Sequence, residues 1–114
     1  MTGATLKIST DKSIELRYTA RRAAKLEEEL GDSLLRGLGK IDRVGVLAKY
    51  IACGADISVG EAYDVYDEYV DNGGTINGAA DVIVKALENG GYISRAAVDA
   101  AKKVKDQLLR AQGS

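Results

Sequence analysis

Residues 14–31, IELRYTARRAAKLEEELG, change from a strand pattern to a helix pattern with no linker between the two. Apolar and charged residues alternate in the first five positions, which indicates a strand with one buried face. Thr19 is then placed to cap a helix of residues 20–30, in which Leu26 lies on the apolar stripe, and Gly31 is placed to end it. The segment therefore predicts a strand that leads directly into a helix.

The residues before this segment predict a β-hairpin. Leu6 and Ile8 alternate with polar residues, and residues 10–13 are polar and typical of a turn, so residues 1–18 are expected to form two antiparallel strands. A lone hairpin is marginal in water. Its apolar face is therefore expected to lie on a helix of the same chain, and its open edge is a possible site of oligomerisation.

Further helices are predicted after Gly31, because each is bounded by cap residues or glycines. Residues 32–38 suit a short helix with three inward leucines, which are Leu34, Leu35 and Leu38. Residues 42–55, with Asp42 as the N-cap, are apolar nearly all round, which indicates a buried central helix that holds Cys53 as a core residue.

The next helices are amphipathic. Ser58 and Glu61 form a capping-box pattern at the start of residues 58–71, and Thr75 is placed to cap residues 75–88. In the former helix one side is apolar and the other acidic; the predicted apolar side comprises Val59, Ala62, Tyr63, Val65, Tyr66, Tyr69 and Val70. The tyrosines of that side are expected at the rim of the core, where the ring is buried and the hydroxyl is wet.

A last helix is predicted from Ser94 to about residue 112, with an apolar seam that includes Ala101, Val104 and Leu108. The seam suits close packing on another helix, either of the same domain or of a partner. The predicted fold is mainly α (α+β): an N-terminal β-hairpin followed by a compact bundle of about five helices. The 114 residues are expected to form a single domain of a hairpin (1–18), a helical core (19–92) and a C-terminal helix (93–114), the last a possible docking arm.

The charges are segregated along the chain although the net charge is only −1. Residues 56–84 carry seven acids and no base, whereas the segments before and after are each net positive. The helix of residues 20–30 also begins with Arg21, Arg22 and Lys25 and ends with acids, against its own dipole. Two explanations stand: a hairpin carboxylate such as Glu15 compensates the basic end, or a partner binds it.

The composition argues against catalysis. The chain has no histidine and one cysteine, so the commonest base, the usual zinc patterns and an internal disulfide are all missing. We therefore expect no enzyme, cofactor or metal site. No secretory leader or apolar run of membrane-spanning length is seen, which favours a reducing cytoplasm. The sequence also has no dominant basic stripe of the kind that binds nucleic acid.

The hairpin that leads through RYTARRAAKLEEELG into a Leu-rich turn and an apolar helix resembles the tail assembly chaperones of long-tailed bacteriophages and prophages. The matching features are the basic-apolar strand at residues 16–18, Thr19, and the Leu-Glu-Glu-Glu-Leu-Gly ending at residues 26–31. The acidic helix before the Asn-Gly-Gly of residues 72–74 and the alanine-rich tail are also similar to that family.

The resemblance implies a non-enzymatic factor of tail morphogenesis. Such a factor shields the long helical tape measure protein and helps to recruit tail tube subunits. It acts in the cytoplasm of the bacterial host and is absent from the mature virion. The candidate partner-binding residues are Arg21, Arg22, Lys25, Tyr63, Tyr66, Ala101, Val104 and Leu108. A homo-oligomer is possible, and neither nucleic acid nor a membrane is an expected partner.

Two other functions fit a small helical chain. One is a structural head-tail joining or tail completion protein of the virion, which would form a stable ring and be found in purified particles. The other is a small DNA-binding regulator with a helix-turn-helix, whose recognition helix should carry several exposed basic or amide side chains. Residues 58–71 are acidic and residues 43–55 are mostly apolar, so neither has the character of a recognition helix.

Overall fold

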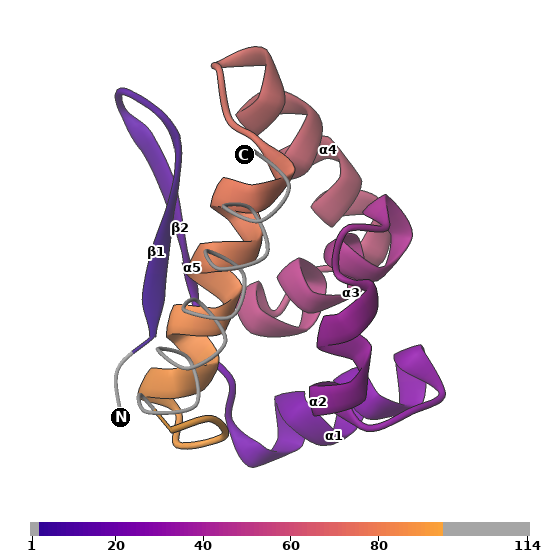
Figure 1. Ribbon diagram of the computed structural model, residues 1–114. Coiled ribbons are helices and arrows are strands. Elements are labelled where there is room, and N and C mark those ends of the chain that lie inside the picture. Colours follow the sequence, from indigo (N-terminus) through magenta and orange to yellow (C-terminus); the bar gives the residue numbers. More distant parts are fainter. Residues whose placement is uncertain (1–2, 95–114) are drawn as a thin grey trace, which may run out of the picture.

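The computed structural model describes residues 3–94 and begins with the predicted hairpin. Strands β1 (Ala4–Ser9) and β2 (Lys12–Leu16) pair antiparallel, with an irregularity in the register near the turn. Their apolar side chains are buried on the helices that cover one face of the hairpin, α4 and α5 for β1 and α3 and α5 for β2 (Figure 1). The expectation that the hairpin would lie on helices of its own chain is thus confirmed.

The fold is mainly α with a β-hairpin, as predicted, and five α-helices follow the strands within the described residues. Their bounds are α1 Ala20–Leu30, α2 Leu34–Gly37, α3 Val44–Ala55, α4 Val59–Asp71 and α5 Ile76–Asn89, with a 3₁₀ turn, η1, at Leu38–Lys40. The predicted last helix lies outside the described residues.

Helix α3 is the central element, because it packs against β2, α1, α4 and α5. Its residues from Leu47 to Gly54 are buried except for Lys49, which confirms the predicted buried helix and the core position of Cys53. The predicted cap Asp42 was wrong. The Arg43 N–H donates to the Lys40 carbonyl oxygen (3.0 Å), so the chain is still in a turn at residue 42 and the helix begins at Val44.

The other predicted caps are present. The hydroxyl of Thr19 accepts from a backbone N–H of α1, and that of Thr75 accepts from one of α5. Ser58 and Glu61 form the complete capping box, each side chain accepting from the other's backbone N–H. Gly31 ends α1 in the left-handed conformation, with a φ of 68°. Local sequence therefore sets the start of α4 and α5 and both ends of α1.

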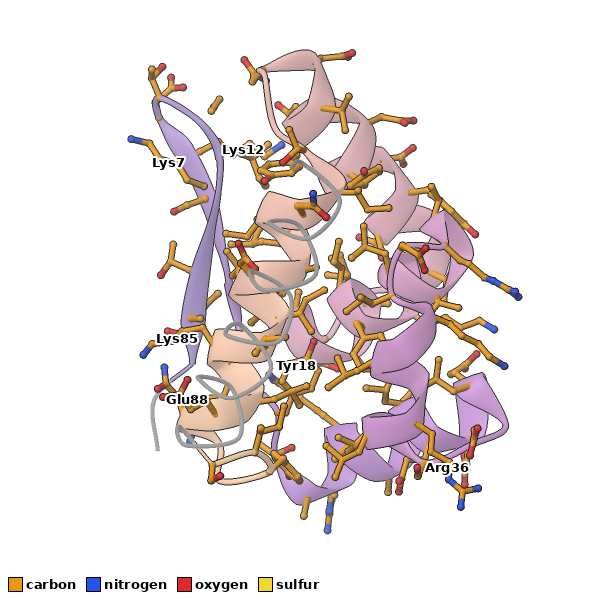
Figure 2. All side chains as sticks on the ribbon, viewed as in Figure 1. Lys7, Lys12, Tyr18, Arg36, Lys85 and Glu88 are labelled. Carbon is orange, nitrogen blue, oxygen red and sulfur yellow. The ribbon has the colours of Figure 1, made fainter. Side chains whose placement is uncertain are left out.

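Two buried tyrosines connect the hairpin to α3 and α2. Tyr18 was predicted within the second strand, but β2 ends at Leu16, because the Arg17 N–H donates to the Gly54 carbonyl oxygen of α3 (2.9 Å) instead of to β1. The Tyr18 hydroxyl donates to the Tyr50 carbonyl oxygen (2.6 Å), and the Tyr50 hydroxyl donates to the Leu34 carbonyl oxygen. Figure 2 shows Tyr18 inside the helical core.

Glycines make room for the aromatic rings of a chain that has neither Phe nor Trp. A Cβ at four glycine positions would lie within 3.0 Å of a tyrosine side chain; the pairs are Tyr18 with Gly54, Tyr50 with Gly37, and Tyr69 with both Gly74 and Gly78. These close approaches are possible only because glycine has no side chain.

Alkaline pH is expected to destabilise the fold through the buried tyrosines. Burial raises the pKa of Tyr18 well above its ordinary value, and burial, with the Asp32 and Glu27 carboxylates, also raises the pKa of Tyr50. In the unfolded chain both ionise near about pH 10, so the stabilisation is complete below that pH and is lost above it, by up to about 1.4 kcal/mol per pH unit for each tyrosine.

Urea unfolding at about pH 9 and at about pH 11, on either side of the ordinary tyrosine pKa of about 10, measures this loss of stability. The double variant Tyr18→Phe/Tyr50→Phe should lose less stability over that range, since it retains only the other titrating groups. Equal losses in the two proteins would contradict a role for the buried hydroxyls.

Candidate functional site

An apolar groove runs beside α1 and is the candidate site. Its volume is about 370 Å³ and its walls come from three parts of the chain. The lining residues are Ala20, Ala23, Ala24 and Glu27 of α1, Ser33, Leu34 and Leu35 at the start of α2, and Tyr92 after α5. The groove was not predicted from the sequence, although the alanines of α1 and the leucine pair that follows α1 are the residues that indicate it.

The groove exists because α1 has two different faces. Leu26 and its neighbours pack into the core, while Ala20 and Ala24 leave a shallow strip beside that contact. Leu35 then stands at the wall of the groove with 53% of its surface exposed. It was predicted to turn inward, but Leu34 takes the buried position in this four-residue helix, and the next side chain is rotated away by about 100°.

Two of the polar side chains that line the groove, those of Glu27 and Ser33, hold the start of α2. The Glu27 carboxylate accepts from the Leu34 N–H (3.1 Å), and the Ser33 hydroxyl accepts from the Arg36 N–H (3.3 Å). Both groups therefore satisfy backbone donors at a helix N-terminus. What the groove offers to a partner is mainly hydrocarbon, from the alanines and from Leu35.

The basic start of α1 lies over the C-terminal end of α3. The Arg22 guanidinium donates to the carbonyl oxygens of Arg17 and Gly54 (3.1 Å each) and lies 3.8 Å from the Asp56 carboxylate. A cation at that position is favoured by the dipole of α3, which offsets the unfavourable dipole of α1. The predicted compensating group, Glu15, forms no ion pair within residues 3–94.

Arg22 is thus half-buried and acts in packing, whereas the other two basic candidates, Arg21 and Lys25, are exposed. By helical spacing, Arg21 and Glu28 are the charged positions nearest Ala24, on the solvent side of the groove. Lys25 is turned farther from the groove, and its charge lowers the pKa of Cys53, but burial outweighs that effect and raises this pKa. Arg21 is thus not one of the lining residues, although helical spacing puts it near their solvent edge, whereas Arg22 contacts the end of α3 and Lys25 is near enough to influence Cys53.

The candidate tyrosines of α4 lie elsewhere. Tyr66 is half-buried, with its ring centroid 6.1 Å from that of the buried Tyr69, and burial raises its pKa. Tyr63 and Val70 are 42% and 43% exposed, so these two positions were predicted wrongly. Helix α4 packs on α3 and β1 along a narrow strip, and this strip does not cover the edges of its apolar side.

The predicted site residues are therefore not gathered at one place. Figure 1 shows α1, which carries Arg21, at the lower end of the molecule, and α4, which carries Tyr63 and Tyr66, toward the upper right. The remaining candidates, Ala101, Val104 and Leu108, lie outside the described residues.

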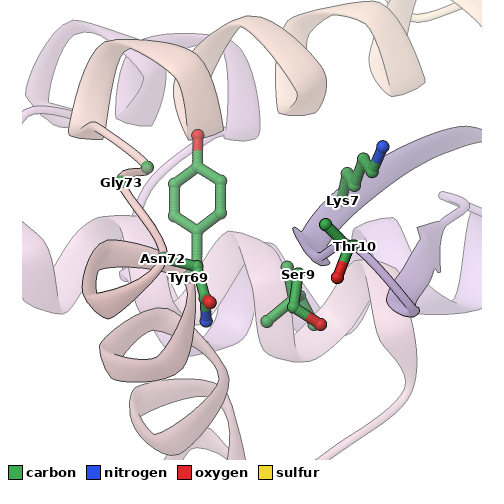
Figure 3. A pocket seen from close by; sticks show the side chains of 8 residues that line it. Lys7, Ser9, Thr10, Tyr69, Asn72 and Gly73 are labelled. Carbon is green, nitrogen blue, oxygen red and sulfur yellow. The ribbon is translucent and has the colours of Figure 1, made fainter.

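A second hollow, of about 340 Å³, lies between the hairpin turn and the end of α4 (Figure 3). Lys7 and Thr10 stand on one side of it and Tyr69 and Asn72 on the other. Nearby, the Lys12 ammonium lies 2.7 Å from the Glu68 carboxylate, and both side chains are exposed. Exposed pairs of this kind contribute about 1 kcal/mol at most, so this contact is a minor support for the hairpin.

Within residues 3–94 no cluster of three or more acidic, cysteine or histidine side chains is placed to hold a metal ion. No described helix has the length and apolar character required to cross a bilayer. Comparison of the chain with protein-family models, with curated proteins and with solved structures finds no match.

Proposed function

We propose that this chain is a tail assembly chaperone of a long-tailed bacteriophage or prophage, and that it binds a helical segment of the tape measure protein in the groove beside α1. The observation that supports this most is the groove itself, a hydrocarbon strip flanked by exposed Leu35. The sequence that resembles the chaperone family supplies the helix that forms this strip.

The groove suits an amphipathic helix. Such a target presents apolar side chains at positions i, i+3 or i+4, and i+7, and lays them into a hydrophobic groove. Alanines on α1 allow the backbone of the target to approach closely, and Leu35 gives the target an apolar anchor at one side. Arg21 and Glu28, exposed at the border, are placed to pair with charges that flank the anchors.

In the proposed function the chain covers its target only transiently. The chain shields apolar helical stretches of the tape measure in the cytoplasm of the bacterial host, helps to bring in tail tube subunits, and is left out of the mature virion. A groove of this size holds only a few side chains, so each contact is weak and several copies are needed along one tape measure. Weak contacts also allow release when tube subunits arrive.

Co-expression with the tape measure protein encoded next to this chain tests the proposal. The wild-type chain should keep the tape measure soluble and co-purify with it, whereas Leu35→Asp should reduce the soluble fraction at least fivefold, because it puts a charge into the apolar wall. The matched control is Val44→Asp, since Val44 is exposed to a similar extent, 46%, but does not line the groove.

Two results would overturn the proposal. One is a tape measure that stays insoluble whether or not the wild-type chain is present, with the chain itself found in mature particles. The other is an equal effect of Leu35→Asp and Val44→Asp, which would leave the groove without a special role. A gene position between the tail tube and tape measure genes is also expected.

A further inference from the structure

Every asparagine of this chain is followed by a glycine. The three pairs are Asn72 with Gly73, Asn77 with Gly78 and Asn89 with Gly90. An asparagine in such a pair can react with its own backbone, because the nitrogen of the next residue can attack the side-chain carbonyl carbon and glycine has no Cβ to obstruct the approach. The reactive groups are the same in all three pairs, so the fold decides which pair reacts first.

The attack requires rotation about the Cα–C bond of the asparagine. Within a helix this rotation breaks backbone hydrogen bonds on both sides of the residue, so part of the helix has to open first. At the C-terminal end of a helix fewer bonds are broken, and an unhindered glycine can absorb the rotation. The surroundings of each pair therefore set the free energy of opening, and with it the rate of reaction.

Asn77 lies in the first turn of α5, and the glycine after it is packed against the core. The Gly78 N–H donates to the Thr75 hydroxyl (3.1 Å). A Cβ at Gly78 would lie 2.5 Å from the hydroxyl oxygen of the buried Tyr69. Rotation at Asn77 would therefore break the cap of α5 and move backbone that touches the core.

Asn89 is the last residue of α5 and is tied to the start of the hairpin. Its half-buried side-chain amide donates to the Gly3 carbonyl oxygen (3.0 Å). The Gly90 N–H donates to the Ala86 carbonyl oxygen (2.9 Å), which closes the last turn of the helix. Reaction at Asn89 would therefore break a contact between distant parts of the chain as well as the end of α5.

Asn72 is bonded to the last turn of its own helix. It is the exposed C-cap of α4, with φ −94° and ψ 17°, and its side-chain amide donates to the Glu68 carbonyl oxygen (2.8 Å). Gly73 is also exposed and has a positive φ of 93°, and its N–H donates to the Val70 carbonyl oxygen (2.9 Å). A Cβ at Gly73 would meet no atom of the described residues within 4 Å, so the turn that leaves α4 (Figure 3) can rotate there without a clash.

We propose that Asn72 is a site of self-modification in the folded chain and that it reacts before Asn77 and Asn89. The Gly73 nitrogen, after losing its proton to solvent, attacks Cγ of Asn72 and closes a five-membered succinimide ring. The bond from Cγ to Nδ2 breaks, and the nitrogen takes a proton from solvent and leaves as ammonia. Water then opens the ring at either carbonyl and gives aspartate or isoaspartate, so the net change exchanges ammonia for water.

The product loosens the end of α4. A carboxylate at position 72 has no N–H to donate to the Glu68 carbonyl oxygen. It also places negative charge at the C-terminal end of a helix, where the dipole is negative and Asp71 already adds a charge. The turn of residues 72–74, which lines the hollow beside the hairpin (Figure 3), should therefore open more often in the modified chain.

Peptide mass spectrometry of the full chain, kept folded at mildly alkaline pH, tests which pair reacts. Asn72 should lose its amide at least about tenfold faster than Asn77 and Asn89, whereas the three should react at similar rates in the urea-unfolded chain. Fragmentation of the tryptic peptide of residues 50–85 separates Asn72 from Asn77. The proposal is overturned if Asn77 or Asn89 reacts as fast as Asn72 in the folded chain, or if Asn72 stays intact for as long as the other two.

Two substitutions test the consequence, because each puts the same new carboxylate near a helix end of opposite polarity. Asn72→Asp should speed hydrogen exchange of the Gly73 and Gly74 amides at least about fivefold. Asn77→Asp, in the first turn of α5, should not speed exchange of the Gly78 amide. Unchanged exchange in Asn72→Asp would overturn the loosening of the turn. Neither experiment uses the tape measure protein, so both results are independent of the proposed function.

Discussion

Replacing Tyr50 with alanine is expected to lower the free energy of unfolding by about 4–6 kcal/mol. The ring is fully buried in α3, and its removal leaves a cavity at the centre of the core. The hydroxyl also donates to the Leu34 carbonyl oxygen, which would be left without that donor. A domain of this size has roughly 5–15 kcal/mol in total, so the variant should be close to unfolded.

The conservative variant separates the two contributions. Tyr50→Phe keeps the ring and loses only the hydrogen bond, and it should cost about 1–3 kcal/mol. Tyr63→Ala serves as the control, because this tyrosine is 42% exposed on α4 and its loss should cost about 1 kcal/mol or less. Urea unfolding monitored by circular dichroism measures all three. Similar losses for Tyr50→Ala and Tyr63→Ala would show that the connection from α3 to α2 does not stabilise the fold.

Gly54→Ala is expected to destabilise the protein by about 1–3 kcal/mol, although alanine is normally the better helix residue by about 1 kcal/mol. The new Cβ would lie 2.9 Å from the Cζ and hydroxyl oxygen of Tyr18 and 3.3 Å from the Cβ of Leu16. Tyr18 cannot move away easily, because it is fully buried and its hydroxyl is bonded to the Tyr50 carbonyl oxygen. The clash therefore outweighs the gain in helix propensity.

Gly60→Ala is the matched control for this prediction. Gly60 is also helical, in α4, but it is exposed, and a Cβ there would have no neighbour nearer than 3.9 Å. This variant should raise the free energy of unfolding by about 0.5–1 kcal/mol. The two substitutions are chemically identical, so their opposite signs in thermal or urea unfolding would identify packing as the cause. A gain in stability from Gly54→Ala would contradict the close contact with Tyr18.

Features encoded within a few residues were predictable from the sequence. Thr19, Ser58 and Gly31 could be assigned as caps because each acts on backbone groups two to four positions away. The buried character of α3 was visible for a related reason, since apolar residues on every side leave no face for water. The hairpin followed from its two alternating segments and the polar turn between them.

Features that depend on distant contacts were not predictable. The hydroxyl of Tyr18 meets α3 at a residue 32 positions later, and the sequence contains no sign of which carbonyl oxygen it will find. The two leucines at 34 and 35 have equal hydrophobicity, and only the way in which α2 sits on α1 decides that one is buried and the other exposed. The groove was missed for the same reason, because its walls come from three segments.

The reversed charges of α1 show how a local anomaly can have a tertiary cause. Basic groups at a helix N-terminus are unfavourable in isolation. In the folded chain Arg22 is the cation at the C-terminal end of α3, next to Gly54 and Asp56. The charge that is unfavourable for the dipole of α1 is therefore favourable for the dipole of α3. The partner-binding explanation for the basic end is therefore not required for Arg22.

The proposed function requires the groove beside α1 to bind a helical segment of the tape measure protein. Amide chemical shifts of the labelled chain, followed during titration with peptides that cover the tape measure sequence, measure this directly. At least one amphipathic peptide should shift the amides of Ala20, Ala24 and Leu35, and Leu35→Asp should abolish these shifts. Shifts confined to α4 or the hairpin, or no shift with any peptide, would contradict the proposed function.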